Sequence, residues 1–269
     1  MRIVVCVKYV PDAQAQRRFV ESDHTVDRAG VDGLLSELDE YAVEEALKLR
    51  ERTDGAADST VTVLSVGPGQ AADALRKALQ MGADAAVHVL DEGLHGSDAP
   101  ATAKVLAAAI GKLEYDLVLT GMASTDAGMS VVPAMVAEYL GLPQVTFANE
   151  LTIEDADAGR GSVVRIVRDG EVNAEVIEAT LPALVSVTDQ INDPRYPSFK
   201  GIMAAKKKPT QTWTLADLGI DPAEVGLAGA WTAVSTVLAR PARQAGQKVA
   251  DQGDGGVKLV EYLAGAKLV

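Results

Sequence analysis

Short apolar runs alternate with amphipathic stretches along the first half of the chain. Residues 2–8 form a continuous apolar run rich in β-branched side chains, which is typical of a strand covered on both faces. Residues 36–52 then switch to helical spacing, with Ser36 placed to cap the first turn and Glu44 and Lys48 spaced as a solvent-side pair. The chain therefore begins with a predicted strand followed by a predicted helix.

The same alternation repeats three more times. Each apolar run is followed by a stretch with helical spacing, and Gly82 is placed to stop one of these helices. Four strand-then-helix units in succession predict an α/β fold with a doubly wound, mostly parallel sheet and right-handed crossovers. The further predicted strands cover residues 61–67, 84–90 and 115–121, and the further predicted helices cover residues 70–83, 99–113 and 131–143.

From about residue 145 the pattern changes to successive strands without helices between them. Polar turns are expected at 154–161 and 168–171, so we expect a β-meander annexed to the sheet. Beyond residue 209 the chain is weakly patterned, and residues 251–256 (DQGDGG) form a predicted flexible joint before a last apolar stretch.

The segment 192–209 (NDPRYPSFKGIMAAKKKP) differs from both patterns. It combines two prolines, exposed-looking aromatic side chains and three consecutive lysines, and it comes soon after an apolar strand. Two interpretations are open at this point: a solvated basic linker, or a surface that binds a partner.

The composition narrows the possible functions. The chain of 269 residues has a formal net charge of -13, which argues against a general nucleic-acid binder, because phosphate neutralisation needs an excess of Lys and Arg. Cys6 is the sole cysteine, which excludes an intramolecular disulfide, a CxxC pair and a cysteine-based zinc site. No uncharged run reaches the roughly 20 residues that span a bilayer, and no signal-peptide cleavage site follows the N-terminal run. We therefore expect a cytoplasmic protein.

The motifs that would carry catalysis do not occur in the sequence. Hydrolase, Walker-type and zinc-protease motifs are missing, and the three histidines lie far apart, so we expect no catalytic residues and no metal site. In an open α/β sheet, ligands bind beyond the carboxyl ends of the strands where the strand order reverses. The candidate loops are therefore residues 6–12 and 121–132, and the second leads into a helix N-terminus that favours a phosphate group.

Several stretches match a known family in order and spacing. VVCVKYVPD (4–12), DEYAVEEALKL (39–49), YDLVLTGMASTD (115–126) and NDPRYPSFKGIMAAKKKP (192–209) resemble the electron transfer flavoprotein β subunit, over residues 2 to about 220. The resemblance implies a Rossmann-like, adenine-nucleotide-binding fold and a heterodimer with an α subunit that carries FAD, while the β subunit holds AMP in a structural role. It further implies electron transfer from flavin dehydrogenases, such as the acyl-CoA dehydrogenases of fatty acid oxidation, to a membrane quinone oxidoreductase and the respiratory chain.

The resemblance places the AMP site on the two candidate loops and on the start of the first helix. Ser130 to Val132 would present backbone amides to the phosphate, and Asp126 would fix the loop or meet the ribose. The chain departs from the residues common in the family at 36–37 and 123–124. The positions carried over are Cys6, Ser36, Glu37, Leu38, Asp39, Val66, Gly121, Met122, Ala123, Ser124, Thr125, Asp126, Ala127, Gly128, Met129, Ser130, Val131 and Val132.

Two alternatives remain open. In a subset of the family, the β subunit binds a second FAD in place of AMP and bifurcates electrons from NADH. The same sheet also occurs in stand-alone adenine-nucleotide-binding proteins of the stress-protein or nucleotide-hydrolase type, which need no flavin partner. This last class gives no reason for the segment 192–209.

The resemblance also divides the chain into three parts. Residues 1–187 would form the nucleotide-binding domain with its β-meander, residues 188–208 a loop that recognises the dehydrogenase, and residues 209–269 an arm that contacts the α subunit. Phe199 occupies the place of the family's apolar anchor, and residues 10–16 would approach the flavin. The residues expected to recognise the partner are Arg195, Tyr196, Phe199, Ile202 and Met203.

Overall fold

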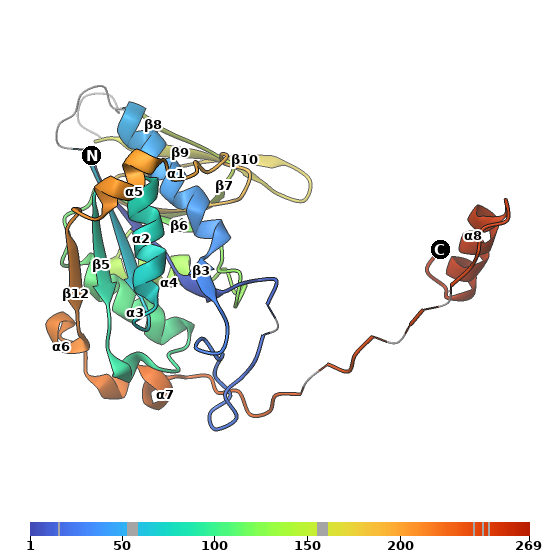
Figure 1. Cartoon of the computed structure of the whole chain (residues 1–269). Helices are drawn as coiled ribbons and strands as arrows, with labels where there is room; N and C mark the ends of the chain where they lie inside the picture. Colours follow the sequence, from blue (N-terminus) through green and yellow to red (C-terminus); the bar gives the residue numbers. More distant parts are fainter. Residues whose placement is uncertain (16, 53–58, 155–160, 239, 244, 247) are drawn as a thin grey trace. The chain divides into compact units, whose positions relative to one another are not determined.

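The computed structural model describes the chain apart from residues 16, 53–58, 155–160, 239, 244 and 247. The chain divides into two compact units, residues 1–235 and residues 236–269. The described residues of the larger unit form three β-sheets. The largest of these lies at its centre (Figure 1).

A seven-stranded parallel sheet forms the centre of the larger unit, in the order β12-β5-β4-β1-β6-β11-β7. Its middle strand β1 is buried on both faces, because Ile3 and Val5 belong to one core cluster and Val4 and Cys6 to the other. This burial explains why the N-terminal run is continuous rather than alternating. The strands are β1 (Arg2–Cys6), β4 (Thr60–Val66), β5 (Ala85–Val89), β6 (Leu117–Gly121), β7 (Gln144–Ala148), β11 (Ala183–Val187) and β12 (Thr210–Trp213).

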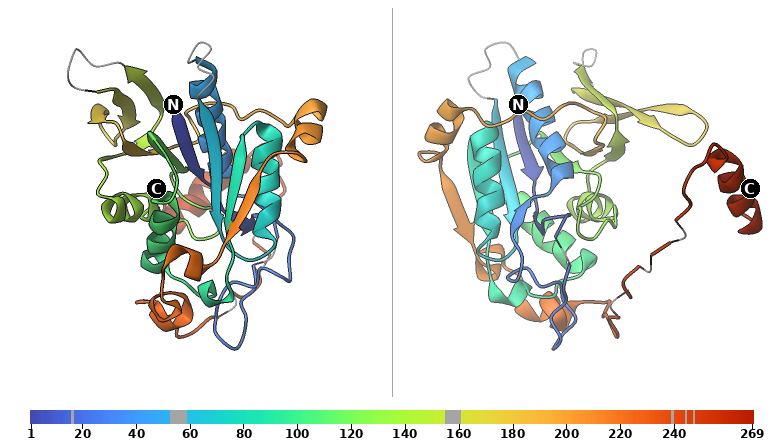
Figure 2. Two further views of the ribbon diagram at one scale, coloured as in Figure 1. Left: turned by 90° about the vertical axis from the view of Figure 1, so that its left-hand side faces the viewer. Right: turned by 45° about the vertical axis from the view of Figure 1, so that its right-hand side comes forward.

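Helices cover both faces of this sheet (Figure 2). Most of the buried apolar side chains of α1 and α2 belong to one core cluster, and most of those of α3 and α4 belong to the other. The predicted α/β fold with a doubly wound, mostly parallel sheet is therefore confirmed. The helices are α1 (Glu37–Arg52), α2 (Ala71–Met81), α3 (Ala99–Ile110) and α4 (Val132–Leu140), with the short turn η1 (Glu92–Leu94) before α3.

A three-stranded antiparallel sheet, in the order β10-β9-β8, forms the predicted β-meander. Two further strands of that region, β7 and β11, join the parallel sheet instead, and β11 is buried along its whole length, as a central parallel strand requires. The predicted turn at 154–161 lies almost entirely outside the described residues. The meander strands are β8 (Glu150–Glu154), β9 (Val163–Asp169) and β10 (Ala174–Thr180), and β2 (Tyr9–Pro11) pairs with β3 (Gly33–Leu35) in a smaller sheet.

The chain beyond residue 209 begins inside the larger unit. Strand β12 pairs with β5 at the edge of the parallel sheet, so the predicted arm overlaps the α/β unit as far as residue 235. Over the described part of the chain, no helix has the length and apolar character needed to cross a membrane. The remaining elements of the larger unit are α5 (Phe199–Ala205), α6 (Leu215–Leu218), η2 (Pro222–Glu224) and α7 (Gly226–Gly229), and the smaller unit contains α8 (Gly255–Gly265).

Two predictions about α1 are wrong. The Ser36 hydroxyl is buried and has no hydrogen-bond partner among the described residues, so it does not cap the helix; only its carbonyl group accepts from the first turn. Glu44 is buried rather than exposed, and Lys48 lies 3.5 Å from Glu45 instead. The segment 192–195 explains the second difference, because it binds this side of α1.

Candidate functional site

The strand order reverses beside β1. From β1 the chain moves to β4 and β5 on one side, and after α3 it returns to β6 on the other side of β1. The carboxyl ends of β1 and β6 therefore lie side by side, with Cys6 opposite Thr120 in the register. Such a reversal forms the ligand-binding crevice of an open α/β sheet.

The Asp39 carboxylate joins this edge of the sheet to the first turn of α1. Its Oδ2 accepts a hydrogen bond from the Lys8 amide at 2.8 Å, and the carboxylate also accepts from the Gly121 amide. Burial raises the pKa of Asp39 to about 7, against the opposing effect of these hydrogen bonds and of the Lys8 charge. One buried side chain thus connects the loops that follow β1 and β6.

Charged side chains anchor the loop 122–131 that follows β6. Lys8 Nζ and Arg28 each lie 2.8 Å from an oxygen of Asp126, and Arg17 donates to two carbonyl groups of the same loop. The Asp126 side chain is buried. Burial alone would raise the pKa of Asp126, but the charge of Lys8 and the hydrogen bonds from Lys8 and Arg28 outweigh it and hold this pKa below its usual value.

The same loop ends at the N-terminus of α4. Gly128 and Ser130 adopt a left-handed backbone conformation, with φ of 63° and 57°, and so turn the chain into the helix. Val131 is the N-cap residue and has no side-chain group that could accept from the first-turn amides. These amides and the helix dipole favour an anion at this end of α4.

Three buried hydroxyl groups at this edge lack a hydrogen-bond partner among the described residues. They belong to Ser36, directly before α1, to Thr120, the neighbour of Cys6, and to Thr125 in the loop 122–131. A buried hydroxyl without a partner costs about 1–3 kcal/mol, so a polar ligand that bonded to any of these groups would offset that cost. The Cys6 thiol is also buried, which raises its pKa to about 12 and keeps it neutral. The edge therefore suits a polar ligand that carries an anionic group.

The predicted nucleotide-binding residues all lie at this edge of the larger unit. Sequence reasoning missed Lys8, Arg17 and Arg28, of which only Lys8 has a local signal, because it follows directly after the first strand. The predicted residues stand at the ends of β1 (Cys6), β4 (Val66) and β6 (Gly121), at the start of α1 (36–39), in the loop 122–131 and at the start of α4 (Val132).

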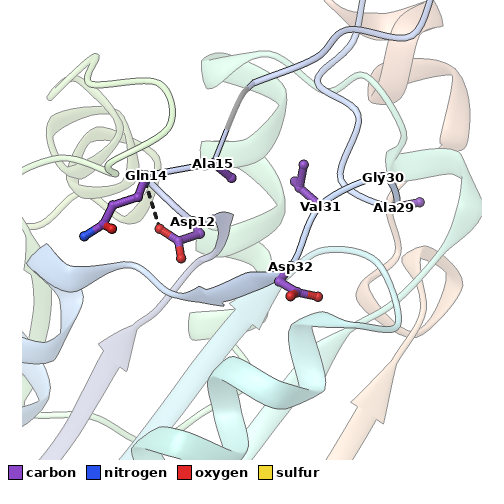
Figure 3. A pocket seen from close by; sticks show the side chains of 7 residues that line it. All are labelled: Asp12, Gln14, Ala15, Ala29, Gly30, Val31 and Asp32. Atoms are coloured by element: carbon purple, nitrogen blue, oxygen red, sulfur yellow. Dashed lines mark hydrogen bonds between the residues drawn. The ribbon is translucent and has the colours of Figure 1, made fainter.

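Two hollows open beside these loops. Figure 3 shows the first, of about 570 Å³, between the loop after β2 (12–15) and the loop before β3 (29–32). Its rim is ordered by the Gln14 amide, which donates to Asp12 Oδ1 at 2.8 Å. The second, of about 380 Å³, adjoins the ends of β6, β7 and β11 and shares Met122 with the predicted nucleotide residues.

Gly121→Ala tests how closely this edge is packed. A Cβ at position 121 would lie 2.6 Å from Asp39 Oδ1 and 2.8 Å from the Leu38 carbonyl oxygen, both shorter than van der Waals contact. We expect the free energy of unfolding, measured with denaturant, to fall by about 1–3 kcal/mol. Gly69→Ala should unfold like the parent chain, because no atom lies within 4 Å of the added Cβ. Equal stabilities of the two variants would contradict the close approach at Gly121.

The predicted partner-recognition residues lie on α5 and just before it. Tyr196 and Phe199 are 90% and 80% exposed, and Ile202 and Met203 are also exposed; these four side chains are called the apolar patch below. Arg195 differs from them, because carboxylates of α1 bind its guanidinium group within the same chain.

Comparisons with known proteins agree on one family. The family model described as "Electron transfer flavoprotein domain" matches residues 23–218. The electron transfer flavoprotein subunit beta of Mycobacterium tuberculosis is 47% identical over 99% of both chains, and that of Megasphaera elsdenii is 36% identical over 100% of both. The caffeyl-CoA reductase-Etf complex subunit CarD of Acetobacterium woodii is 37% identical over 93% of this chain and 92% of its own length. Because these similarities extend over nearly the whole chain, it belongs to the electron transfer flavoprotein β-subunit family.

Proposed function

We propose that this chain holds AMP in a structural role and supports the FAD-carrying α subunit of a heterodimeric electron transfer flavoprotein. Membership of the family itself implies association with flavin and with an α subunit, and makes the chain part of an electron carrier. The observation that carries the nucleotide proposal is the loop 122–131, which three cations hold at the N-terminus of α4 beside the buried Thr120 hydroxyl.

The contacts of the three cations indicate which groups would hold the phosphate. Lys8 and Arg28 both bind the Asp126 carboxylate, and Arg17 binds main-chain carbonyl groups, so the three cations already have partners. The first-turn amides of α4 would then hold the anion, which suits the one phosphate of AMP. A second FAD in this site, with its pyrophosphate, is the alternative that the next experiment distinguishes.

Extraction of the bound nucleotide tests the proposal. We expect the chain and its α subunit to purify as a yellow complex, from which acid releases one AMP and one FAD per heterodimer, as counted by chromatography. Two FAD per heterodimer would identify a subunit with a second flavin. A colourless monomer that hydrolyses ATP would refute the carrier and favour the stand-alone nucleotide-binding protein.

A matched pair of variants locates the AMP within the fold. Thr120→Val should lower the AMP that remains after gel filtration, because it removes the buried hydroxyl beside Cys6. Ser65→Ala removes another buried hydroxyl from the opposite face of the sheet and should retain the nucleotide. Equal AMP content in the two variants would argue against a ligand on the Thr120 side.

The apolar patch is the proposed docking site for flavin dehydrogenases, such as acyl-CoA dehydrogenases. Exposed aromatic side chains on a monomer are the usual anchors of a protein interface, and Phe199 is the proposed anchor here. Electrons accepted by the α-subunit FAD would pass to a membrane quinone oxidoreductase and the respiratory chain, and so serve fatty acid oxidation from the cytoplasm.

Two other segments are proposed to face the α subunit. Residues 209–269 would contact it as an arm, which the exposed apolar side chains of α8, among them Val257, Val260 and Tyr262, support. Residues 10–16 would approach the flavin, and the hollow in Figure 3 adjoins the described part of this loop.

A further inference from the structure

Arg195 stands immediately before the apolar patch and is bound to α1 at five points. Its Nε and Nη2 donate to the two oxygens of Glu44, at 2.7 and 3.0 Å, and its backbone amide donates to Glu44 Oε2 at 3.2 Å. Its Nη1 and Nη2 donate to the two oxygens of Glu51, at 2.7 and 3.1 Å. Glu44 and Glu51, both on α1, therefore bind one guanidinium group. Paired donors and acceptors of this kind give strong and oriented ion pairs.

The two carboxylates that bind Arg195 differ in burial. The Glu44 side chain is 7% exposed, whereas that of Glu51 is 51% exposed. Asn192 adds two hydrogen bonds of 3.1 Å to the same helix, one to the Tyr41 carbonyl group and one to Glu45. Hydrogen bonds to Glu51 and Glu44 raise the pKa of Arg195, so the guanidinium keeps its charge at every physiological pH. The segment 192–195 thus covers the Glu44 carboxylate, and within the described part of the chain Arg195 is the one cation that pairs with it.

The contacts that fix Arg195 on α1 also affect the apolar patch, because the patch begins at the next residue of the chain. Tyr196 is the next residue, and Phe199 lies four residues beyond Arg195, with Pro197 between them limiting the backbone. Ser198 accepts a hydrogen bond from the Gly201 amide and so fixes the start of α5. Both exposed aromatic side chains are therefore presented from a segment whose near end is fixed to α1.

The hydrogen bonds that Arg195 makes within the chain argue against its direct contact with a partner. Its single positive charge already faces two carboxylates, so the cluster of Arg195, Glu44 and Glu51 carries a net negative charge. An acidic partner surface would be repelled by the cluster, and four of the five guanidinium hydrogen-bond donors are used within the chain.

We propose that Arg195 is a positioning residue for dehydrogenase docking: through Glu44 and Glu51 it fixes the segment 192–195 on α1 and thereby pre-orders Tyr196 and Phe199 without itself touching the dehydrogenase. The inference rests on the proposed docking function of the apolar patch. Without Arg195, Glu44 would be left covered and unpaired, and the segment would have to lift from α1 to return that carboxylate to water. Docking would then have to include the ordering of the segment.

The test uses the α/β heterodimer and a reduced acyl-CoA dehydrogenase in steady-state electron transfer. Arg195→Met should raise the KM for the heterodimer roughly fivefold to tenfold with kcat and flavin content unchanged. Glu44→Gln should produce part of the same defect, because Glu51 still binds the guanidinium group, and adding Glu44→Gln to Arg195→Met should make that variant no worse, because the contact with Glu44 is already lost. Arg195→Lys should recover part of the loss. Arg165→Met, which breaks an exposed ion pair with Glu178 on the meander, should behave like the parent.

Three results would overturn the inference. A defect in Arg195→Met with normal behaviour of the combined Glu44→Gln and Glu51→Gln variant would show that Arg195 touches the partner directly. Parent-like kinetics of both variants, while Phe199→Ala is impaired, would leave the docking function standing and remove the positioning role. Parent-like kinetics of Phe199→Ala itself would refute the docking function on which the inference rests.

Discussion

Replacing Phe199 by alanine will slow electron transfer from a flavin dehydrogenase by about 30-fold or more, while the heterodimer keeps its full flavin content. The side chain is 80% exposed and begins α5, where the Ser198 cap holds it in a fixed place. Truncation of an anchor residue typically costs 2 kcal/mol or more of binding free energy, and each 1.4 kcal/mol corresponds to a factor of ten. Stopped-flow reduction of the heterodimer, at dehydrogenase concentrations below saturation, measures the effect.

A second exposed apolar residue gives the matched control for this experiment. Val172 is 89% exposed in the turn between β9 and β10, away from the apolar patch along the chain. Val172→Ala removes a similarly exposed side chain and should leave the reduction rate unchanged. If Phe199→Ala instead lost flavin, the residue would have to hold the two subunits together, and the apolar patch would be part of that interface.

The strand and helix alternation of the first half could be predicted because each unit has its own periodicity. The sheet that β7 and β11 join could not be predicted, since it depends on long-range pairing: β11 pairs with distant β6, and β7 pairs with β11. β12 is harder still, because its residues are mostly exposed and polar, and its place depends on pairing with β5 more than 100 residues earlier in the chain.

The edge at which the strand order reverses could be predicted from topology, but its electrostatics could not. Asp126 meets Lys8 and Arg28 across 118 and 98 residues of sequence, and no local pattern indicates such a contact. The rule that favours pairs four residues apart on a helix predicted Glu44 with Lys48, yet Arg195 from a distant segment replaces Lys48 and buries Glu44. Long-range contacts therefore determine the partners of these charged side chains, whereas the local sequence pattern is enough to predict the fold class.

Asp39→Asn will abolish a pH dependence of stability that the parent chain shows near neutral pH. Burial gives Asp39 a pKa of about 7 in the folded chain, compared with 3.8 for an ordinary aspartate. Because the folded chain holds this proton more tightly, its contribution to stability is complete below pH 4 and is lost as the pH rises through 7. The full difference corresponds to roughly 4 kcal/mol.

Denaturant unfolding of the parent and Asp39→Asn chains between pH 5 and pH 8 measures this effect. The stability of the parent relative to the variant should fall by roughly 2–3 kcal/mol over that range, because asparagine keeps an oxygen for the amides of Lys8 and Gly121 but has no proton to lose. Glu37→Gln is the control, since it removes an exposed carboxylate from the same turn of α1 and should change the stability little at any pH. If the difference in stability between the parent and Asp39→Asn did not change with pH, the hydrogen bonds from the two backbone amides, and not burial, would determine the ionisation of Asp39. The ionised carboxylate would then hold the loops that follow β1 and β6 together over the whole pH range, and their stability would not depend on pH.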